Sequence, residues 1–318
     1  MSVTQPRRSS RDWSRFATPA WCYAFMLPAL VLAALFTFYP MVMSWVYSTV
    51  DWNGFSSDIE FVGLANYREL MSDGLFWDAF GRSLIFVLVG TPLRVIGALL
   101  VAIVLNQQAL KLSPAFRTMF FMPVVTTAAI VGIVMTFIFG PYGGPLNEVL
   151  VSLDVVDAPV DFLGDSDTAI WAVLLTHTWK NFGITMIYWL AALQTVPQSY
   201  YEAAKVDGAG AFALLRHITL PVLLPFAVVI IVLTANENLH AFALVQAMTA
   251  GGPFFSTQVI EVYIYQTAFA ADATGGGVPR LGYASAAGCF FGTAALVLAL
   301  IQGIAVRQTS RMRKQLKA

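Results

Sequence analysis

The sequence QTVPQSYYEAAKVDGAGAFALLRHITLP, residues 194–221, connects two long apolar runs and decides how the chain is organised. It predicts a short helix, a sharp turn, a second short helix and, at Pro221, an entry into the next apolar run. Pro197 suits the start of the first helix. Ser199, followed three residues later by Glu202, matches the capping box that closes a helix N-terminus.

The turn between these two helices carries its own signal, Asp207-Gly208, because glycine takes the positive φ that such turns require. Before the turn, Ala203 and Ala204 leave a smooth helix surface that another protein can approach closely. Local physics alone leaves two readings open. The loop is either a docking surface for a partner protein or an ordinary helical connection between two membrane spans.

Apolar runs flank this loop and recur along the chain. A bilayer core needs about 20 apolar residues per helix, and six runs are long enough: 22–46, 83–105, 116–139, 169–193, 220–245 and 283–306. Prolines inside several runs predict kinks, which a helix bundle tolerates where neighbouring helices satisfy the freed carbonyl groups. The first run is too long for a signal peptide and has no Ala-x-Ala site after it, which favours a retained anchor.

The composition agrees with a protein embedded in a membrane. Of the 318 residues, 58% are hydrophobic and 11% are charged, whereas roughly 25% are charged in soluble domains. These values exclude a soluble enzyme of this size and a disordered chain, and the net charge of zero argues against nucleic-acid binding. Cys22 and Cys289 lie in apolar runs, which indicates small core residues and no disulfide framework.

Basic residues in short loops predict the orientation, because they collect on the cytoplasmic side of a membrane. Thirteen of them lie in the N-terminal segment 1–20, in two loops and in the tail 307–318, whereas the opposite segments hold only Arg68 and Arg280. We therefore expect both termini and the 194–220 loop in the cytoplasm. Segment 61–70 is amphipathic and too short to cross, so we expect it along the outer interface. The thirteen residues are Arg7, Arg8, Arg11, Arg15, Lys111, Arg117, Lys205, Arg216, Arg307, Arg311, Arg313, Lys314 and Lys317.

No catalytic or metal-binding motif appears in the sequence. There is no G-x-x-x-x-G-K-[ST] phosphate loop and no H-E-x-x-H, G-x-S-x-G or C-x-x-C motif, and the three histidines lack metal-ligand spacing. We therefore expect no catalytic residue and no metal site, which leaves a transport role. An ion-coupled secondary carrier is the alternative, but such carriers have repeated halves that this sequence does not show.

Glu202-Ala-Ala-Lys-Val-Asp207-Gly208-Ala209, followed by Ile218-Thr-Leu-Pro221 and Pro225, resembles the EAA loop of permease subunits in binding-protein-dependent ABC importers. Segments 61–67, 117–123, 249–253 and 282–286 resemble the carbohydrate-uptake branch, of the maltose and glycerol-3-phosphate type. The resemblance covers nearly the whole chain. It implies an all-α integral membrane fold, with residues 1–318 forming one permease domain of six transmembrane helices.

The resemblance also implies how the 194–220 loop works. The loop would dock into a cleft on a cytoplasmic ATPase subunit, with Glu202 making a polar contact and Ala203 and Ala204 allowing close packing. Asp207 and Gly208 would provide the bend.

The resemblance further implies the partners of the chain. Two such ATPases would bind the ATP and Mg, so this chain would hold no cofactor and would be no enzyme. A second homologous permease and an extracytoplasmic solute-binding protein would complete the importer in a prokaryotic cytoplasmic (inner) membrane.

Polar residues inside the apolar runs are the candidates for contact with a sugar-like solute, because charged groups at mid-membrane usually face the bundle interior. Asn236, Glu237, Asn238 and His240 offer donors and acceptors, and Lys180 lies near the middle of its run. An aromatic platform is expected beside them from Trp179, Tyr188 and Trp189. Alternatively these polar groups join helices, through a pair such as Glu237–Lys180 or Glu237–Arg94.

Two departures from the family bear on which solute is chosen. Asn236-Glu237-Asn238-Leu239-His240 stands where many relatives begin with an aromatic residue, and Gly275-Gly276-Gly277 lengthens the last outer loop. The sequence is compatible with a disaccharide, an oligosaccharide, a monosaccharide or a glycerophosphate. It is also compatible with the main solute contacts lying in this chain or in its sister permease.

Overall fold

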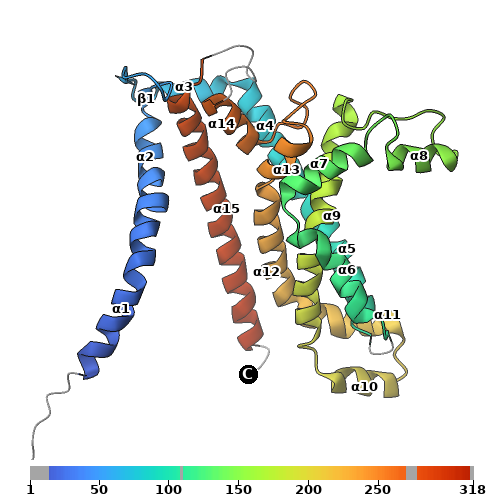
Figure 1. The fold of residues 1–318 in the computed structure, drawn as a ribbon. Helices are drawn as coiled ribbons and strands as arrows, with labels where there is room; N and C mark the ends of the chain where they lie inside the picture. The colour runs from blue at the N-terminus through green and yellow to red at the C-terminus, as the bar shows by residue number, and fades with distance from the viewer. Residues whose placement is uncertain (1–13, 108–109, 270–277, 316–318) are drawn as a thin grey trace, which may run out of the picture.

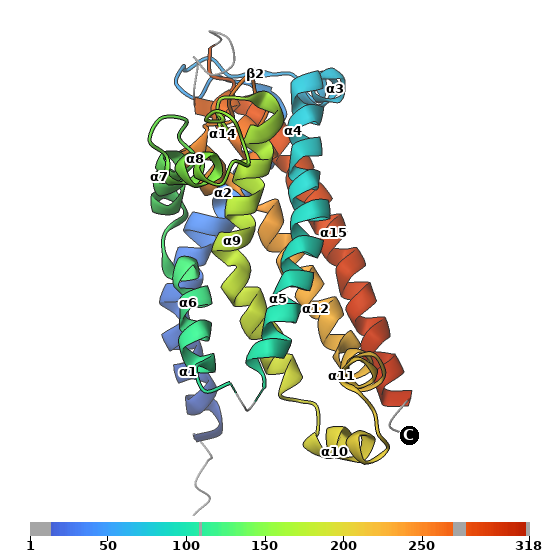
Figure 2. The ribbon, with the colours of Figure 1, turned by 90° about the vertical axis from the view of Figure 1, so that its right-hand side faces the viewer.

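Long helices run side by side in the computed structural model, and short helices lie across both ends of the bundle (Figure 1). The structure describes residues 14–107, 110–269 and 278–315, so Gly275-Gly276-Gly277 and the first basic residues, Arg7, Arg8 and Arg11, lie outside the described part. We name the two ends of the bundle after the helices that cross them, the α10 end and the α14 end (Figure 2).

The described elements follow one another with short connections. The helices are α1 Ser14–Ala33, α2 Tyr39–Tyr47, α3 Ala65–Ser72, α4 Gly74–Ile85, α5 Thr91–Leu105, α6 Ser113–Val125, α7 Ala128–Ile138, α8 Pro145–Ser152, α9 Ser166–Leu193, α10 Gln198–Val206, α11 Ala211–Leu214, α12 Leu220–Leu239, α13 Phe242–Met248, α14 Ile260–Phe269 and α15 Leu281–Gln315. Strands β1 Val50–Asp51 and β2 Glu60–Phe61 pair antiparallel. Three π-helical turns, Ala34–Phe38, Phe86–Gly90 and Leu215–Thr219, join α1 to α2, α4 to α5 and α11 to α12.

Four described helical runs are long and apolar enough to cross a membrane: Trp21–Tyr47, Gly74–Leu105, Ala211–Leu239 and Leu281–Leu300. They correspond to the first, second, fifth and sixth predicted runs. The fourth predicted run lies in α9, which has 28 residues and is therefore about 42 Å long, but it contains more polar residues than the other four. Helix α15 continues through the basic tail to Gln315, so the tail is not a separate segment within the described residues.

The third predicted run, 116–139, is not one continuous span. Helices α6 and α7 meet at an angle of 101°, and the residues between them, Thr126 and Thr127, have extended backbone with ψ of 139° and 142°. Pro123 weakens the last turn of α6, because proline has no N–H and its ring clashes with a carbonyl in the preceding turn. The prediction of a mere kink at this proline was wrong.

Helix α9 is the central helix of the bundle. Sixteen of its 28 residues are buried, and it packs against α5, α6 and α12. Gly183 allows the closest of these approaches, since a Cβ at this position would lie 2.2 Å from the carbonyl oxygen of Phe120 on α6. Gly132 of α7 has the same function against α13, where a Cβ would lie 2.6 Å from the Cβ of Ala247.

Helices α1 and α2 lie apart from this bundle (Figure 1). None of the apolar window between Trp21 and Tyr47 is buried within the chain. Helix α2 contacts α15 near the α14 end, while α1 diverges from it toward the α10 end (Figure 1). The first predicted run is therefore a long helix that presents apolar side chains on all sides.

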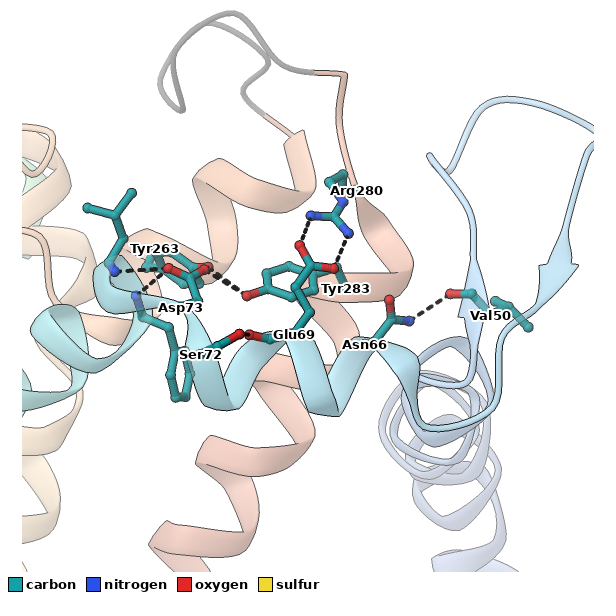
Figure 3. Close-up of polar contacts among 10 residues, drawn as sticks. Val50, Asn66, Glu69, Ser72, Asp73, Tyr263, Arg280 and Tyr283 are labelled. Atoms are coloured by element: carbon teal, nitrogen blue, oxygen red, sulfur yellow. Dashed lines mark hydrogen bonds and ion pairs between the residues drawn. The ribbon is translucent and has the colours of Figure 1, made fainter.

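A polar cluster ties α3 to α14 and α15 at the α14 end (Figure 3). Asp73 caps α4 by accepting bonds from the N–H groups of Leu75 and Phe76, at 2.9 and 3.3 Å. Its second oxygen accepts bonds from the hydroxyl groups of Tyr263 and Tyr283, at 2.5 and 2.7 Å. The short segment 65–72, predicted as a helix too short to cross, is confirmed as α3 and is held here against the long helices.

Charge contributes to the same cluster. Glu69 and Arg280 form a bidentate pair at 2.6 and 2.8 Å, and this bond from Arg280 is the main reason why the pKa of Glu69 lies below its ordinary value. Burial raises the pKa of Asp73, but its four hydrogen bonds together outweigh burial and leave that pKa lowered. The stabilisation from both carboxylates is present above about pH 4, the unfolded pKa, and is lost as the pH falls through their lower native values.

The close approach at Gly183 predicts a strong effect of one added methyl group. Gly183→Ala is expected to separate α6 from α9 and to destabilise the protein by about 1–3 kcal/mol, as overpacking does in a filled core. The control is Gly288→Ala on α15, where the added Cβ meets no atom within 4 Å. Thermal unfolding of the purified protein measures both variants, and equal melting temperatures would contradict the assigned packing.

Candidate functional site

Helix α10 lies across one end of the bundle, where it connects α9 with α11 (Figures 1 and 2). The helix begins at Gln198, and Pro197 is its N-cap with ψ of 133° and no side-chain cap. The prediction of a capping box at Ser199 was therefore wrong, since Ser199 lies within the first turn. Proline already fixes its own φ and forces the residue before it to be extended, which ends the preceding segment without a serine cap.

The turn after α10 agrees with the prediction. Gly208 has a φ of +77°, its N–H donates to the carbonyl of Lys205 at 3.1 Å, and the N–H of Ala209 donates to the carbonyl of Ala204 at 2.9 Å. These two bonds form a Schellman motif, in which a left-handed residue satisfies the last carbonyl groups of a helix. Helix α11 is not separate from the next span, because Leu215–Thr219 continues it as a π-helical turn into α12.

One face of α10 is attached to the bundle and the other is free in the described chain. The hydroxyl of Tyr201 lies 3.0 Å from that of Thr219, at the start of α12. Glu202, Ala203, Asp207 and Gly208 are exposed, and Ala204 is half-buried. The five residues predicted to contact an ATPase thus lie on one short helix and its terminal turn, as a continuous exposed surface.

A polar pocket of about 290 Å³ lies between α9, α12 and α13, with Ala128 of α7 at its edge. It brings together four of the predicted solute residues: Lys180 from α9, and Asn236, Glu237 and His240 from α12 and its end. His177 and Asn181 of α9 also line it. The predicted convergence of these polar groups on one cavity is therefore present in the fold.

Glu237 forms an ion pair with Arg94 of α5. The side chain of Arg94 is fully buried, whereas that of Glu237 is 36% exposed. Of the two pairs expected from the sequence, the structure thus forms Glu237–Arg94. Glu237 both joins two helices and lines the pocket, so the alternative of interhelical pairing and that of a cavity position are both met by the same side chain.

Two predicted residues lie elsewhere. Asn238 is buried and donates to the hydroxyl of Thr91 at 2.9 Å, so it joins α12 to α5 and does not line the pocket. Trp179 is 48% exposed and lines a separate apolar groove beside the bend between α6 and α7. A one-residue step along a helix turns a side chain by about 100°, which separates both residues from their neighbours Glu237 and Lys180.

The expected aromatic platform does not form in this pocket. Trp189 is 2% exposed, and its ring N–H donates to the carbonyl of Val95 at 3.0 Å, which fixes it between α9 and α5. Tyr188 does not line the pocket either. The three aromatic residues lie on different faces of α9, which an inspection of neighbouring residues in the sequence does not reveal.

Sequence reasoning missed Glu261, the first acidic residue of α14. One of its oxygens lies 2.7 Å from Nδ1 of His240, and the other accepts a bond from the N–H of Phe242 at 3.0 Å. These contacts hold the break between α12 and α13, which ends the fifth predicted run at Leu239 and not at residue 245. The polar run from Asn236 to His240 was the available signal for this break.

A bundle of long apolar helices, an exposed helix-turn-helix connection at one end and a polar pocket between the spans define a multi-pass membrane transport protein. Comparisons with known proteins identify the family. Residues 62–311 match the family described as "Binding-protein-dependent transport system inner membrane component". The chain belongs to this family, and it is a permease subunit of an ABC importer.

Individual relatives agree along nearly the whole length. The chain is 32% identical to the "Probable ABC transporter permease protein YurN" of Bacillus subtilis, over 88% of this chain and 94% of the relative. It is 31% identical to the "Lactose transport system permease protein LacF" of Rhizobium radiobacter, over 90% and 94%. Among solved structures, it matches one chain of a bacterial alginate ABC transporter in complex with an alginate pentasaccharide-bound periplasmic protein. That match has a TM-score of 0.75 and 25% identity, over 94% of this chain and 98% of the other.

The Arg94–Glu237 pair predicts a coupled loss of stability. Removing one partner of a buried pair costs roughly 3–5 kcal/mol, and we expect the lower end of that range or less because Glu237 is partly exposed. Arg94→Met and Glu237→Leu should therefore each lower the melting temperature of the purified protein. The double variant should lose less than the sum of the two, by about 1 kcal/mol or more.

A matched control for this cycle is the pair Asp78–Arg82 on α4, at 3.9 Å, in which Asp78 is 66% exposed. The same cycle with Asp78→Leu and Arg82→Met is expected to give a coupling of about 0.5 kcal/mol or less. Additive effects at Arg94 and Glu237 would mean that the two side chains do not interact.

Proposed function

We propose that this permease translocates a sugar or sugar-like solute, which an extracytoplasmic binding protein delivers, and that it is driven by two separate ATP-binding subunits. It would form a heterodimer with a second homologous permease in the cytoplasmic membrane of a prokaryote. The single observation that carries the proposal is the exposed surface of α10, which ends in the Schellman turn at Gly208. Support for the solute comes from relatives named for lactose, multiple sugars and diacetylchitobiose.

Helix α10 is connected directly to the two helices that line the polar pocket. The four residues 194–197 separate it from α9, and the contact between Tyr201 and Thr219 attaches it to the start of α12. Lys180 lies on α9 and Glu237 on α12. A displacement of α10 by an ATPase therefore moves both walls of the pocket, and this supports α10 as the site where ATP hydrolysis is coupled to solute movement.

The ATP and Mg belong, in this proposal, to the partner subunits. Glu202 would make the polar contact with the ATPase, and Ala203 and Ala204 would allow its close approach, since their side chains are single methyl groups. Asp207 and Gly208 would set the angle at which α10 is presented. The chain itself would hold no cofactor.

The orientation follows from the same arrangement. The first described residue of α1, Ser14, and the last residue of α15, Gln315, lie at the α10 end of the bundle (Figure 1). Since basic residues also collect there, we propose that the α10 end faces the cytoplasm and that the α14 end receives the binding protein.

Cysteine labelling tests this orientation. In a Cys22→Ser, Cys289→Ser background, we expect Asp157→Cys to react with a membrane-impermeant maleimide added to intact cells. Lys111→Cys, which is also exposed, is expected to react only after the membrane is permeabilised. The reverse pattern would place α10 outside and would rule out docking to a cytoplasmic ATPase.

Gly208 provides a sharp test of coupling. A β-branched residue strains a left-handed position by on the order of 1–3 kcal/mol, so Gly208→Val should displace α10 and strongly reduce ATP hydrolysis stimulated by the solute-loaded binding protein. Glu202→Ala removes one contact on an exposed helix and should weaken attachment of the ATPase to a lesser degree. The measurement is the ATPase activity of the purified complex.

The matched control is Gly210→Val. Gly210 is two residues away, is equally free of contacts within 4 Å, and has a φ of −73° that valine adopts without strain. We expect this variant to retain most of the stimulation. Full stimulation in the Gly208→Val complex would show that α10 merely connects two spans.

A further inference from the structure

The positive charges around the polar pocket outnumber the carboxylates that are free to pair with them. Three charged side chains meet between α5, α9 and α12: Arg94, Lys180 and Glu237. Glu237 is already paired with Arg94. Arg94 still leaves its Nε and Nη1 without a hydrogen-bond partner among the described residues, and both atoms are buried.

Lys180 is therefore the cation without a counter-charge. Its side chain is 8% exposed, it lines the pocket, and no described residue lies within hydrogen-bond or ion-pair distance of its ammonium group. The next carboxylate, Glu261, is not available to it, because both of its oxygens are bonded to the backbone and side chain at the break after α12. Burying an unpaired ammonium group is costly, whereas a bound anion removes most of that cost.

We propose that Lys180 binds an anionic group of the solute, so that the transported molecule is an acidic sugar bearing a carboxylate or a phosphate. The inference rests on the proposed function, since it assigns the pocket to the solute pathway. Asn236 and Asn181 line the same pocket and present amide groups that suit sugar hydroxyls. One charged contact and several neutral ones are the arrangement that distinguishes an acidic sugar from a neutral sugar of the same size.

The shape of the pocket supports this assignment. Its volume of about 290 Å³ is at the lower end of small-molecule sites, which are roughly 300–1,000 Å³, and it accommodates one sugar unit at a time. Lys180 approaches from α9, while Glu237 and Asn236 approach from α12. A solute held between the two helices would therefore be released when α10 moves them apart.

Protection of a cysteine in the pocket tests the proposal without the binding protein. Ala243 is exposed and lines the pocket, so Ala243→Cys in the Cys22→Ser, Cys289→Ser background reports on occupancy through its rate of reaction with N-ethylmaleimide. The assembled complex is labelled in the presence of D-glucose, D-glucuronate or glucose 6-phosphate at equal ionic strength. We expect at least one anionic probe to slow labelling at about a tenfold lower concentration than glucose.

Variants of Lys180 assign the preference to this side chain. Lys180→Gln should remove the advantage of the anionic probe, and Lys180→Arg should retain it. Lys111→Gln, which removes the same charge from an exposed loop, should leave it unchanged. Protection by glucuronate alone would specify a carboxylate, and protection by glucose 6-phosphate alone would specify a phosphate.

Two results would overturn the inference. Equal protection by glucose and both anions, or a preference that persists in Lys180→Gln, would leave the pocket as a sugar site and reject the role of Lys180. If no probe slows labelling in the complex with Lys180 intact, the pocket is not on the solute pathway, and that part of the proposed function fails together with the inference.

Discussion

The ion pair between Arg94 and Glu237 fixes the part of the bundle on which the pocket depends. Arginine stays protonated in proteins, so a fully buried guanidinium requires a carboxylate at that place. The pair sets the rotation of α12 relative to α5, and the bond from Asn238 to Thr91 fixes the next residue in the same direction. Asn236 and the remaining face of Glu237 are then turned toward α9, where Lys180 lies.

The break after Leu239 follows from a second carboxylate. Glu261 binds His240 and the first N–H of α13, and these bonds replace the helical ones that the break removes. The same residue lies at the start of α14, which crosses the end of the bundle (Figure 1). The two ends of the protein are thus connected through α12, with the turn at Gly208 before it and Glu261 after it, and the pocket lies between them.

The features that the sequence predicted correctly depend on local chemistry. Gly208 takes a positive φ because its own turn requires one, and the apolar runs become helices because no other structure satisfies their backbone in lipid. The incorrect predictions depend on tertiary contacts. The bend between α6 and α7 is shaped by the packing of Gly132 against Ala247, and the aromatic platform fails because Trp189 binds a carbonyl of α5. Neither contact has a signature in neighbouring residues.

The contrast between α9 and α1 shows what the membrane requires of each helix. Helix α9 contains His177, Lys180 and Asn181, is the more polar of the two, and is covered by other helices on most of its surface. The window from Trp21 to Tyr47 is uncovered and has no charged side chain. Lipid tolerates only apolar side chains, whereas polar ones persist where protein surrounds them. The polarity that kept α9 from the four clearly apolar spans therefore marks it as the interior helix, and an interior helix is where a pathway for a polar solute has to lie.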